Sequence, residues 1–101
     1  MINGLGPDAP TCVNEHGGLQ AYTPYRFDLM DGKAMFALAK VLGEGANKYG
    51  VRNWEKISVD EHLNHLLQHV YGYLAGDGSD EHLEHALCRA LFAVAVHLED
   101  K

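Results

Sequence analysis

The sequence lacks several features that would indicate particular classes of protein. Its 101 residues contain no apolar run near the roughly 20 residues of a membrane-spanning helix, so we expect no membrane contact. Residues 1–13 carry neither a cationic flank nor an apolar stretch, and we therefore expect no signal peptide. The two cysteines, Cys12 and Cys88, show no CxxC spacing, which favours reduced thiols and a cytoplasmic location.

Positive charge is also scarce. Lysine and arginine number 8 against 14 aspartates and glutamates, which gives a formal net charge of -6. A nonspecific nucleic-acid binder needs a basic stripe, so we expect no nucleic-acid partner. A small phosphorylated ligand needs only a few local cations and remains compatible with this composition.

Helical periodicity extends over most of the chain, and no strand pattern competes with it. All three prolines lie within residues 1–24, which we expect to form an irregular N-terminal arm. Residues 25–101 are predicted to form a single helical nucleotide-binding domain. An arm with apolar residues on so short a chain favours a homo-oligomer.

Three main helices are expected, and the fold class is therefore all-α. The first begins near Asp31 and is ended by Gly50. The second opens with a capping box, in which Ser58 and Glu61 satisfy each other's amides, and runs to about Leu74. The third covers about 80–97. The tight turn before it makes the second and third helices an antiparallel hairpin whose leucine stripes are expected to be core.

Four of the seven histidines lie in an octet that occurs twice. Asp-Glu-His-Leu-x-His-x-Leu begins at Asp60 and again at Asp80. Residues three or four apart share a helix face, so each copy presents two imidazoles side by side. In an antiparallel hairpin the two rows run in opposite directions. His69, which lies nearest the turn, is therefore expected to approach His82 or His85.

The histidine rows have two functional interpretations. Imidazole binds divalent transition metals, and nearby carboxylates such as Asp80 would fix the imidazole tautomer. The same imidazoles could instead bind phosphate together with Arg89, because a guanidinium holds phosphate through two hydrogen bonds. A structural role beside the helix seam is the third interpretation. The candidate metal ligands are His65, His69, His82 and His85.

Cations, aromatic rings and an amide are concentrated at residues 48–54, Lys-Tyr-Gly-Val-Arg-Asn-Trp. Aromatic faces stack bases, amides recognise base edges and cations bind phosphate, so the segment favours a nucleotide pocket. We expect Trp54 to pack in the core, and Lys48 or Asn53 to contact the ligand. Arg26 either binds phosphate or pairs with one of the two aspartates that follow it. The candidate ligand-binding residues are Arg26, Lys48, Tyr49, Asn53, Trp54, His69 and Arg89.

Glu44 lies near the C-terminal end of the first predicted helix, where a negative charge is unfavourable and needs compensation. Lys48, four residues later, is the simplest expected partner, and a metal or a histidine would also serve. Glu44 and His65 are our candidate catalytic residues.

Three stretches together resemble a known family. They are Pro-Tyr-Arg-Phe-Asp-Leu at 24–29, Gly-Ala-Asn-Lys-Tyr-Gly-Val-Arg-Asn-Trp at 45–54, and the histidine helices with the Gly-Asp pair at 76–77 between them. Over about residues 14–98 the chain is similar to the phage and prophage family called dATP/dGTP diphosphohydrolase, N-terminal domain. It is more distantly similar to the all-α pyrophosphohydrolases of the MazG kind. The resemblance implies hydrolysis of a purine deoxynucleoside triphosphate to monophosphate and pyrophosphate, with a divalent metal.

The MazG-like enzymes hold magnesium with a Glu-Glu-x-x-Glu helix and a later Glu-x-x-Asp. Here the first helix offers only Glu44, and the matching faces of the other two helices carry histidine. Magnesium prefers oxygen ligands, so this set suits manganese, zinc or nickel better than magnesium.

The residues support two hypotheses for function. The first is a metal-dependent pyrophosphohydrolase acting on a purine (deoxy)nucleoside triphosphate, with Mn, Zn or Mg as the cation. The second is a non-catalytic, phage-type nucleotide-binding protein that sequesters a cyclic or ADP-ribose-derived immune signal. For either function we expect a homo-oligomer in the cytoplasm, which is that of a bacterial host if the protein is phage-encoded.

Overall fold

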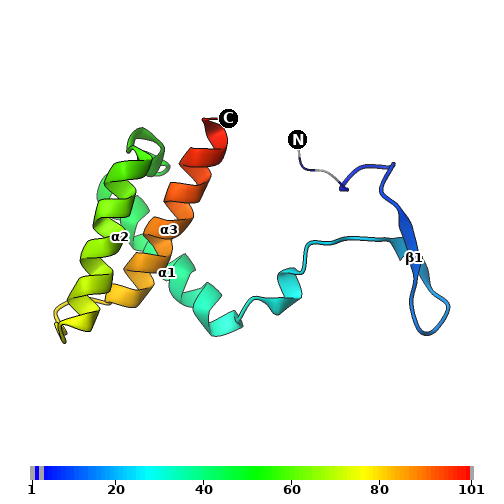
Figure 1. Cartoon of the computed structure of the whole chain (residues 1–101), viewed down its shortest axis with the longest axis horizontal. Helices are drawn as coiled ribbons and strands as arrows, with labels where there is room; N and C mark the ends of the chain where they lie inside the picture. The colour runs from blue at the N-terminus through cyan, green and yellow to red at the C-terminus, as the bar shows by residue number, and fades with distance from the viewer. Residues whose placement is uncertain (1, 3, 101) are drawn as a thin grey trace. The chain divides into compact units, whose positions relative to one another are not determined.

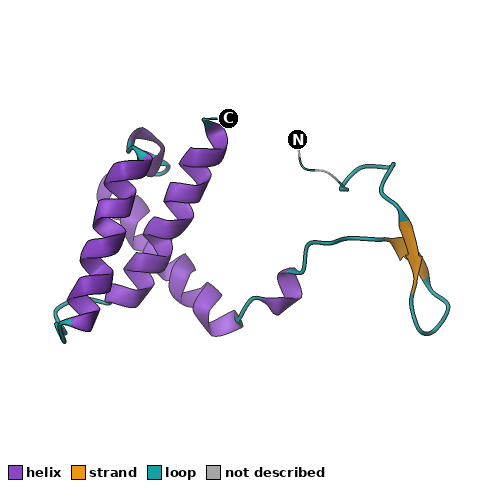
Figure 2. Ribbon diagram, in the orientation of Figure 1, coloured by secondary structure: helices purple, strands orange, loops and turns teal. Residues whose placement is uncertain are grey.

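The computed structural model describes residue 2 and residues 4–100. The chain divides into two compact units, Met1–Asp31 and Gly32–Lys101. The first contains a pair of short strands and the second contains three helices (Figures 1 and 2). Within the described part of the chain, no helix has the length and hydropathy needed to span a membrane.

The first unit contains a small hairpin that the sequence interpretation missed. Strands β1 (Thr11–Val13) and β2 (Leu19–Ala21) pair antiparallel (Figure 2). The Asn14 side chain closes their loop, because its Oδ1 accepts hydrogen bonds from the amides of His16 at 3.0 Å and Gly18 at 2.8 Å. Strands of three residues are too short to show an alternating pattern, which is why the sequence predicted an irregular arm.

Helix α1 (Gly32–Tyr49) has nearly the predicted bounds. It begins one residue after Asp31 and ends before Gly50, whose φ of 102° is the left-handed conformation that glycine adopts freely. Val41 is its buried residue. A 3-10 helix, η2 (Asn53–Lys56), follows.

Both ends of helix α2 (Val59–Leu74) are closed by local hydrogen bonds. The predicted capping box is present: Ser58 Oγ accepts from the Glu61 amide at 3.2 Å, and the Glu61 carboxylate accepts from the Ser58 amide at 3.3 Å. At the other end Gly76 has a φ of 81°, and its amide donates to the carbonyl of Tyr73 at 3.0 Å. This is a Schellman motif, which stops the helix and starts the turn.

Helix α3 (His82–Glu99) begins two residues later than predicted. The Asp80 carboxylate accepts a hydrogen bond from the Glu81 amide at 2.8 Å, and Glu81 has a ψ of 73°, outside the helical region. These two residues therefore belong to the turn, and Asp80 is free to present its side chain beside the helix rather than within it.

Helices α1 and α2 both pack against α3. Helix α2 lies alongside α3 as the predicted antiparallel hairpin, while α1 and η2 contact α3 (Figure 1). The apolar side chains that become buried are Val41, Cys88 and Ala93. His62 is also fully buried, which makes a polar side chain part of a small core.

The leucine stripes predicted as core are largely exposed, so that expectation was wrong for most of their members. Leu91 is 43% exposed and Leu98 is 62% exposed. The period of a helix shows which side chains share a face, but it does not show which face a neighbour covers. The exposed members of the stripes are Leu63, Leu67, Leu74, Leu83, Leu87, Leu91, Val94 and Leu98.

Candidate functional site

A cleft of about 680 Å³ opens between the C-terminal part of α1, the loop with η2, and the histidine faces of α2 and α3. Its size suits a nucleotide-sized ligand. Most of the predicted site residues line it. They are Glu44, Lys48, Tyr49, Asn53, Trp54, His65, His69, His85 and Arg89.

The buried His62 connects Arg89 to the backbone of the loop. Arg89 Nη1 lies 3.1 Å from His62 Nδ1, and His62 Nε2 lies 3.0 Å from the Trp54 carbonyl oxygen. An arginine can only donate, so Nδ1 accepts and Nε2 carries the proton that it donates to the carbonyl. His62 is therefore a neutral ring with both nitrogens engaged, and it holds the guanidinium of Arg89 at the cleft.

Trp54 is both core and cleft wall. Its ring stacks on Phe92, with centroids 5.0 Å apart and an angle of 4° between the planes. His62 lies against the same phenyl ring at 5.4 Å. Sequence reasoning missed Phe92, although a lone aromatic residue among the alanines and valines of the third helix was a usable signal.

Two histidines and an aspartate gather at the end of the cleft nearest the α2–α3 turn. His69, Asp80 and His85 each offer a ligand atom, and these atoms all lie within 4.8 Å of one another. The His69 and His85 rings stack at 5.1 Å, and His85 Nε2 lies 3.4 Å from Asp80 Oδ1. Burial and the nearby His85 lower the pKa of His69, so its ring is held in the neutral form that ligates metals. The predicted approach of His69 to His85 is confirmed.

The other two histidines predicted as metal ligands have different surroundings. His82 contacts His69 through Nδ1 at 2.9 Å and Asp77 through Nε2 at 2.6 Å, so neither nitrogen is free for a metal. His65 is exposed on the cleft wall and does not belong to the cluster. Asp80, which we placed among the supporting carboxylates, takes a position inside the cluster.

Glu44 has a cationic partner other than the one predicted. Lys40, one turn earlier, lies 3.9 Å from Glu44 and 3.5 Å from Glu81. Lys48 instead places its Nζ 5.1 Å from the centre of the Tyr49 ring. The expectation of a Glu44–Lys48 pair was therefore wrong, because either lysine lies one turn from Glu44 and Lys40 can also reach the acidic start of α3.

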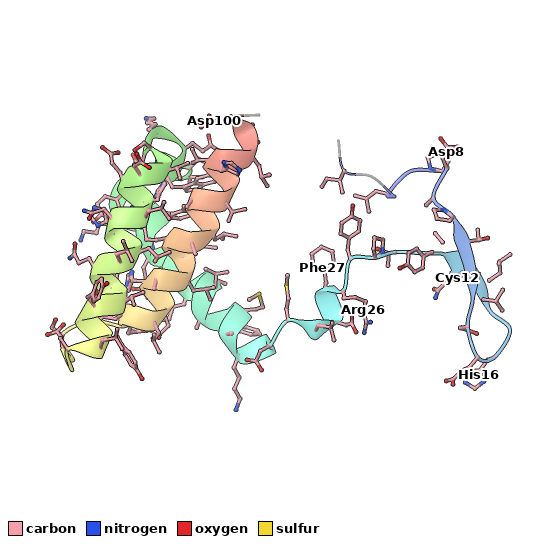
Figure 3. All side chains as sticks on the ribbon, viewed as in Figure 1. Asp8, Cys12, His16, Arg26, Phe27 and Asp100 are labelled. Carbon is pink, nitrogen blue, oxygen red and sulfur yellow. The ribbon has the colours of Figure 1, made fainter. Side chains whose placement is uncertain are left out.

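Arg26 belongs to the first unit and forms the ion pair that was the alternative to phosphate binding. It precedes the 3-10 helix η1 (Phe27–Leu29), as the labels in Figure 3 show. Its Nε and Nη2 atoms donate to the two carboxylate oxygens of Asp28 at 2.9 and 2.8 Å. The guanidinium lowers the pKa of Asp28.

The donor chemistry of the cluster fits a divalent transition metal better than magnesium. Two imidazoles and one carboxylate suit zinc, manganese, cobalt or nickel, whereas magnesium requires mainly oxygen ligands. In a tetrahedral site with bonds of about 2.0–2.2 Å, neighbouring ligand atoms lie about 3.3–3.6 Å apart. The ligand atoms of His69, Asp80 and His85, which lie within 4.8 Å of one another, would therefore have to move closer together to bind one ion.

These features define a small helical protein in which one cleft combines a guanidinium, aromatic rings and a candidate metal centre. A family model described as dATP/dGTP diphosphohydrolase, N-terminal, matches residues 14–101. The chain thus belongs to this N-terminal domain family, as its sequence predicted, and the description of the family supports a relation to nucleotide hydrolases. Neither a curated protein nor a solved structure matches the chain.

Proposed function

We propose that this protein is a metal-dependent pyrophosphohydrolase that converts a purine deoxynucleoside triphosphate to the monophosphate and pyrophosphate. The observation that carries the proposal is that the His69, Asp80 and His85 cluster lines the same cleft as Arg89 and Trp54. Metal ligands, a phosphate-binding cation and a stacking ring are the three components such a reaction needs.

Separate residues of the chain bind the triphosphate, the base and the metal in this proposal. Arg89, held by His62, binds the triphosphate, and Lys48 adds a second cation from the last turn of α1. Trp54 and Tyr49 stack against the base, and the Asn53 amide contacts its edge. A divalent cation bound by His69, Asp80 and His85 would neutralise phosphate charge and lower the pKa of a bound water.

Hydrolysis adds one water and breaks one bond. The water oxygen forms a bond to the α-phosphorus, the bond to the bridging α–β oxygen breaks, and pyrophosphate leaves. Glu44 and His65, both exposed on the cleft wall, are the groups we propose to orient the water and accept its proton.

The test is turnover of dATP and dGTP by the purified chain with manganese, zinc or magnesium. We expect monophosphate and pyrophosphate in equal amounts, with manganese or zinc more effective than magnesium. E44Q and H85A are expected to reduce kcat/KM by at least about 100-fold, in line with the loss of a proton acceptor or a metal ligand. E99Q, which removes a carboxylate at the exposed end of α3, serves as the charge-matched control. If E44Q and H85A are as active as the E99Q control, Glu44 and His85 take no part in the mechanism.

A second function is favoured by the shortage of carboxylates in the cleft. Glu44 and Asp80 are the acidic side chains in its lining, fewer than the carboxylate-rich metal motifs of the MazG-like enzymes supply. Such a cleft also suits a protein that retains a nucleotide-derived signal, such as a cyclic or ADP-ribose-derived molecule, without hydrolysing it. Stoichiometric retention of intact ligand, released by denaturation, would support this function over hydrolysis.

We also propose that the protein acts as a homo-oligomer through its exposed leucine face. On α3, Leu87, Leu91, Val94 and Leu98 follow the four-three-four spacing of helices that pack in bundles. This row lies on the opposite side of α3 from the residues at the cleft. A second copy could therefore cover it without closing the cleft.

A further inference from the structure

A series of hydrogen bonds leads from the α2–α3 turn to the candidate metal site formed by His69, Asp80 and His85. Ser79 Oγ donates to Asp77 Oδ2 at 2.6 Å, and His82 Nε2 lies 2.6 Å from the same oxygen. His82 Nδ1 then lies 2.9 Å from Nδ1 of His69. These hydrogen bonds therefore begin at an exposed turn and end at His69, which lines the cleft.

The carboxylate of Asp77 fixes the proton on the His82 nitrogen that faces it. An ionised carboxylate only accepts, and hydrogen bonds from Ser79 and His82 lower the pKa of Asp77. His82 Nε2 therefore carries a proton. When His82 is neutral, its other nitrogen, Nδ1, has a lone pair and accepts the proton that His69 Nδ1 donates. The remaining nitrogen of His69, Nε2, is then left without a proton.

We propose that Asp77 and a neutral His82 are positioning residues that fix the tautomer of His69, so that its Nε2 presents a lone pair to a divalent transition-metal ion. The inference rests on the metal site of the proposed function and adds the two residues that make the site competent. Carboxylate and imidazole partners of a ligating histidine orient its ring and raise its basicity. His82, which the sequence suggested as a ligand, here acts through His69 instead.

One glycine holds both positioning residues in place. A Cβ atom at Gly72 would lie 2.9 Å from ring atoms of His82, closer than real Cβ contacts, so the ring is seated where only a glycine leaves room. The Gly72 carbonyl oxygen also accepts the hydrogen bond from the Asp77 amide, at 3.0 Å. The Schellman motif that ends α2 thereby delivers the carboxylate to His82.

The tautomer can be measured without any metal. Nitrogen NMR of the imidazole groups in the metal-free protein distinguishes a protonated ring nitrogen from one with a lone pair. We expect His69 to carry its proton on Nδ1 in the wild-type protein and to lose this preference in H82A. A wild-type His69 protonated on Nε2 would overturn the proposal.

Metal affinity tests the consequence. Titration with Co²⁺, followed by its visible absorption, and with Zn²⁺, followed by calorimetry, should show about 10–100-fold weaker binding in H82A and G72A than in wild type. G43A is the matched control, because a Cβ at this exposed position on α1 meets nothing within 4 Å. Wild-type affinity in H82A or G72A would refute the positioning role.

The two measurements separate this inference from the proposed function. If wild-type His69 has the expected tautomer but the protein binds neither cation, the metal-dependent function fails while the tautomer assignment stands. If the metal binds tightly and His69 Nε2 is protonated in the metal-free protein, the tautomer assignment fails and the function survives. Far-UV circular dichroism of each metal-free variant confirms that the helices are intact.

Discussion

His62 is the residue on which the geometry of the cleft depends most. It is completely buried, it donates to the Trp54 carbonyl, and it accepts from Arg89. A polar ring in so small a core is stable because each of its nitrogens has a partner. The same ring joins α2, the loop and α3, so its loss should affect stability and ligand binding together.

We predict that H62A lowers the free energy of unfolding by about 2–4 kcal/mol, because it creates a cavity and leaves the Trp54 carbonyl without its donor. Urea denaturation measures this change. H65A, three residues further along the same helix and exposed, should change stability by no more than about 0.5 kcal/mol. Equal effects of the two substitutions would show that the His62 network contributes nothing specific.

The two cysteines are predicted to differ in reactivity. Cys88 is 4% exposed, and its burial raises the pKa of its thiol above the usual value of 9.0. A raised pKa leaves less of the reactive thiolate at any pH below that range. Cys12 is partly exposed on β1 (Figure 3).

Iodoacetamide at pH 8 should therefore modify one equivalent, at Cys12, in the folded protein and both cysteines in urea, as mass spectrometry of the peptides would show. The rate at Cys88 should increase with pH beyond 9. Rapid modification of Cys88 at pH 8 would contradict the buried position assigned to it.

At the scale of elements, local signals set the helix boundaries. The capping box at Ser58 and the glycines at 50 and 76 act within one turn of the chain, so the sequence alone located the helix ends to within two residues. Asp80 is the instructive exception. It was predicted to start α3, but its carboxylate bonds the next amide and leaves the helix to begin at His82.

We predict that S58A costs about 1 kcal/mol of stability, since it removes an acceptor from the first turn of α2. S58D, which keeps a capping acceptor, is the control and should remain close to wild type. Thermal or urea unfolding followed by circular dichroism measures both. If S58A has the same unfolding midpoint as wild type, the hydrogen bonds of the capping box do not contribute to stability.

The candidate site was predictable where it depended on helix geometry. Antiparallel pairing alone indicated that His69 would approach His82 or His85, and in the structure it contacts both. The sequence could not show that His82 contacts Asp77 rather than a ligand, because that contact depends on the space left at Gly72. The choice of Lys40 over Lys48 as the partner of Glu44 likewise depended on where α3 begins.

At the scale of the whole molecule, the exposed leucine face has to be explained. Hydrophobic side chains of this size are normally removed from water, and the buried apolar residues of the described chain are few. The exposed row Leu87, Leu91, Val94 and Leu98 lies along one face of α3, and in our proposal a second copy of the chain covers it.

We predict that the wild-type protein has a solution mass that is a multiple of its 11.1 kDa chain. L91E should shift it toward the monomer, because an unpaired carboxylate buried in the interface costs several kcal/mol. Q68E, at an exposed polar position on α2, is the control and should leave the mass unchanged. Light scattering after gel filtration measures all three. A wild-type mass of one chain would contradict the proposed assembly.

The most direct measurement of the central claim is a single-turnover assay. The purified protein, in excess over dATP or dGTP and supplied with Mn²⁺, is quenched at intervals and its nucleotides are separated by chromatography. The account predicts that triphosphate disappears as monophosphate and pyrophosphate appear in equal amounts, and that H85A slows the conversion by at least about 100-fold. Triphosphate that remains intact at every interval, with the metal bound, would contradict the account.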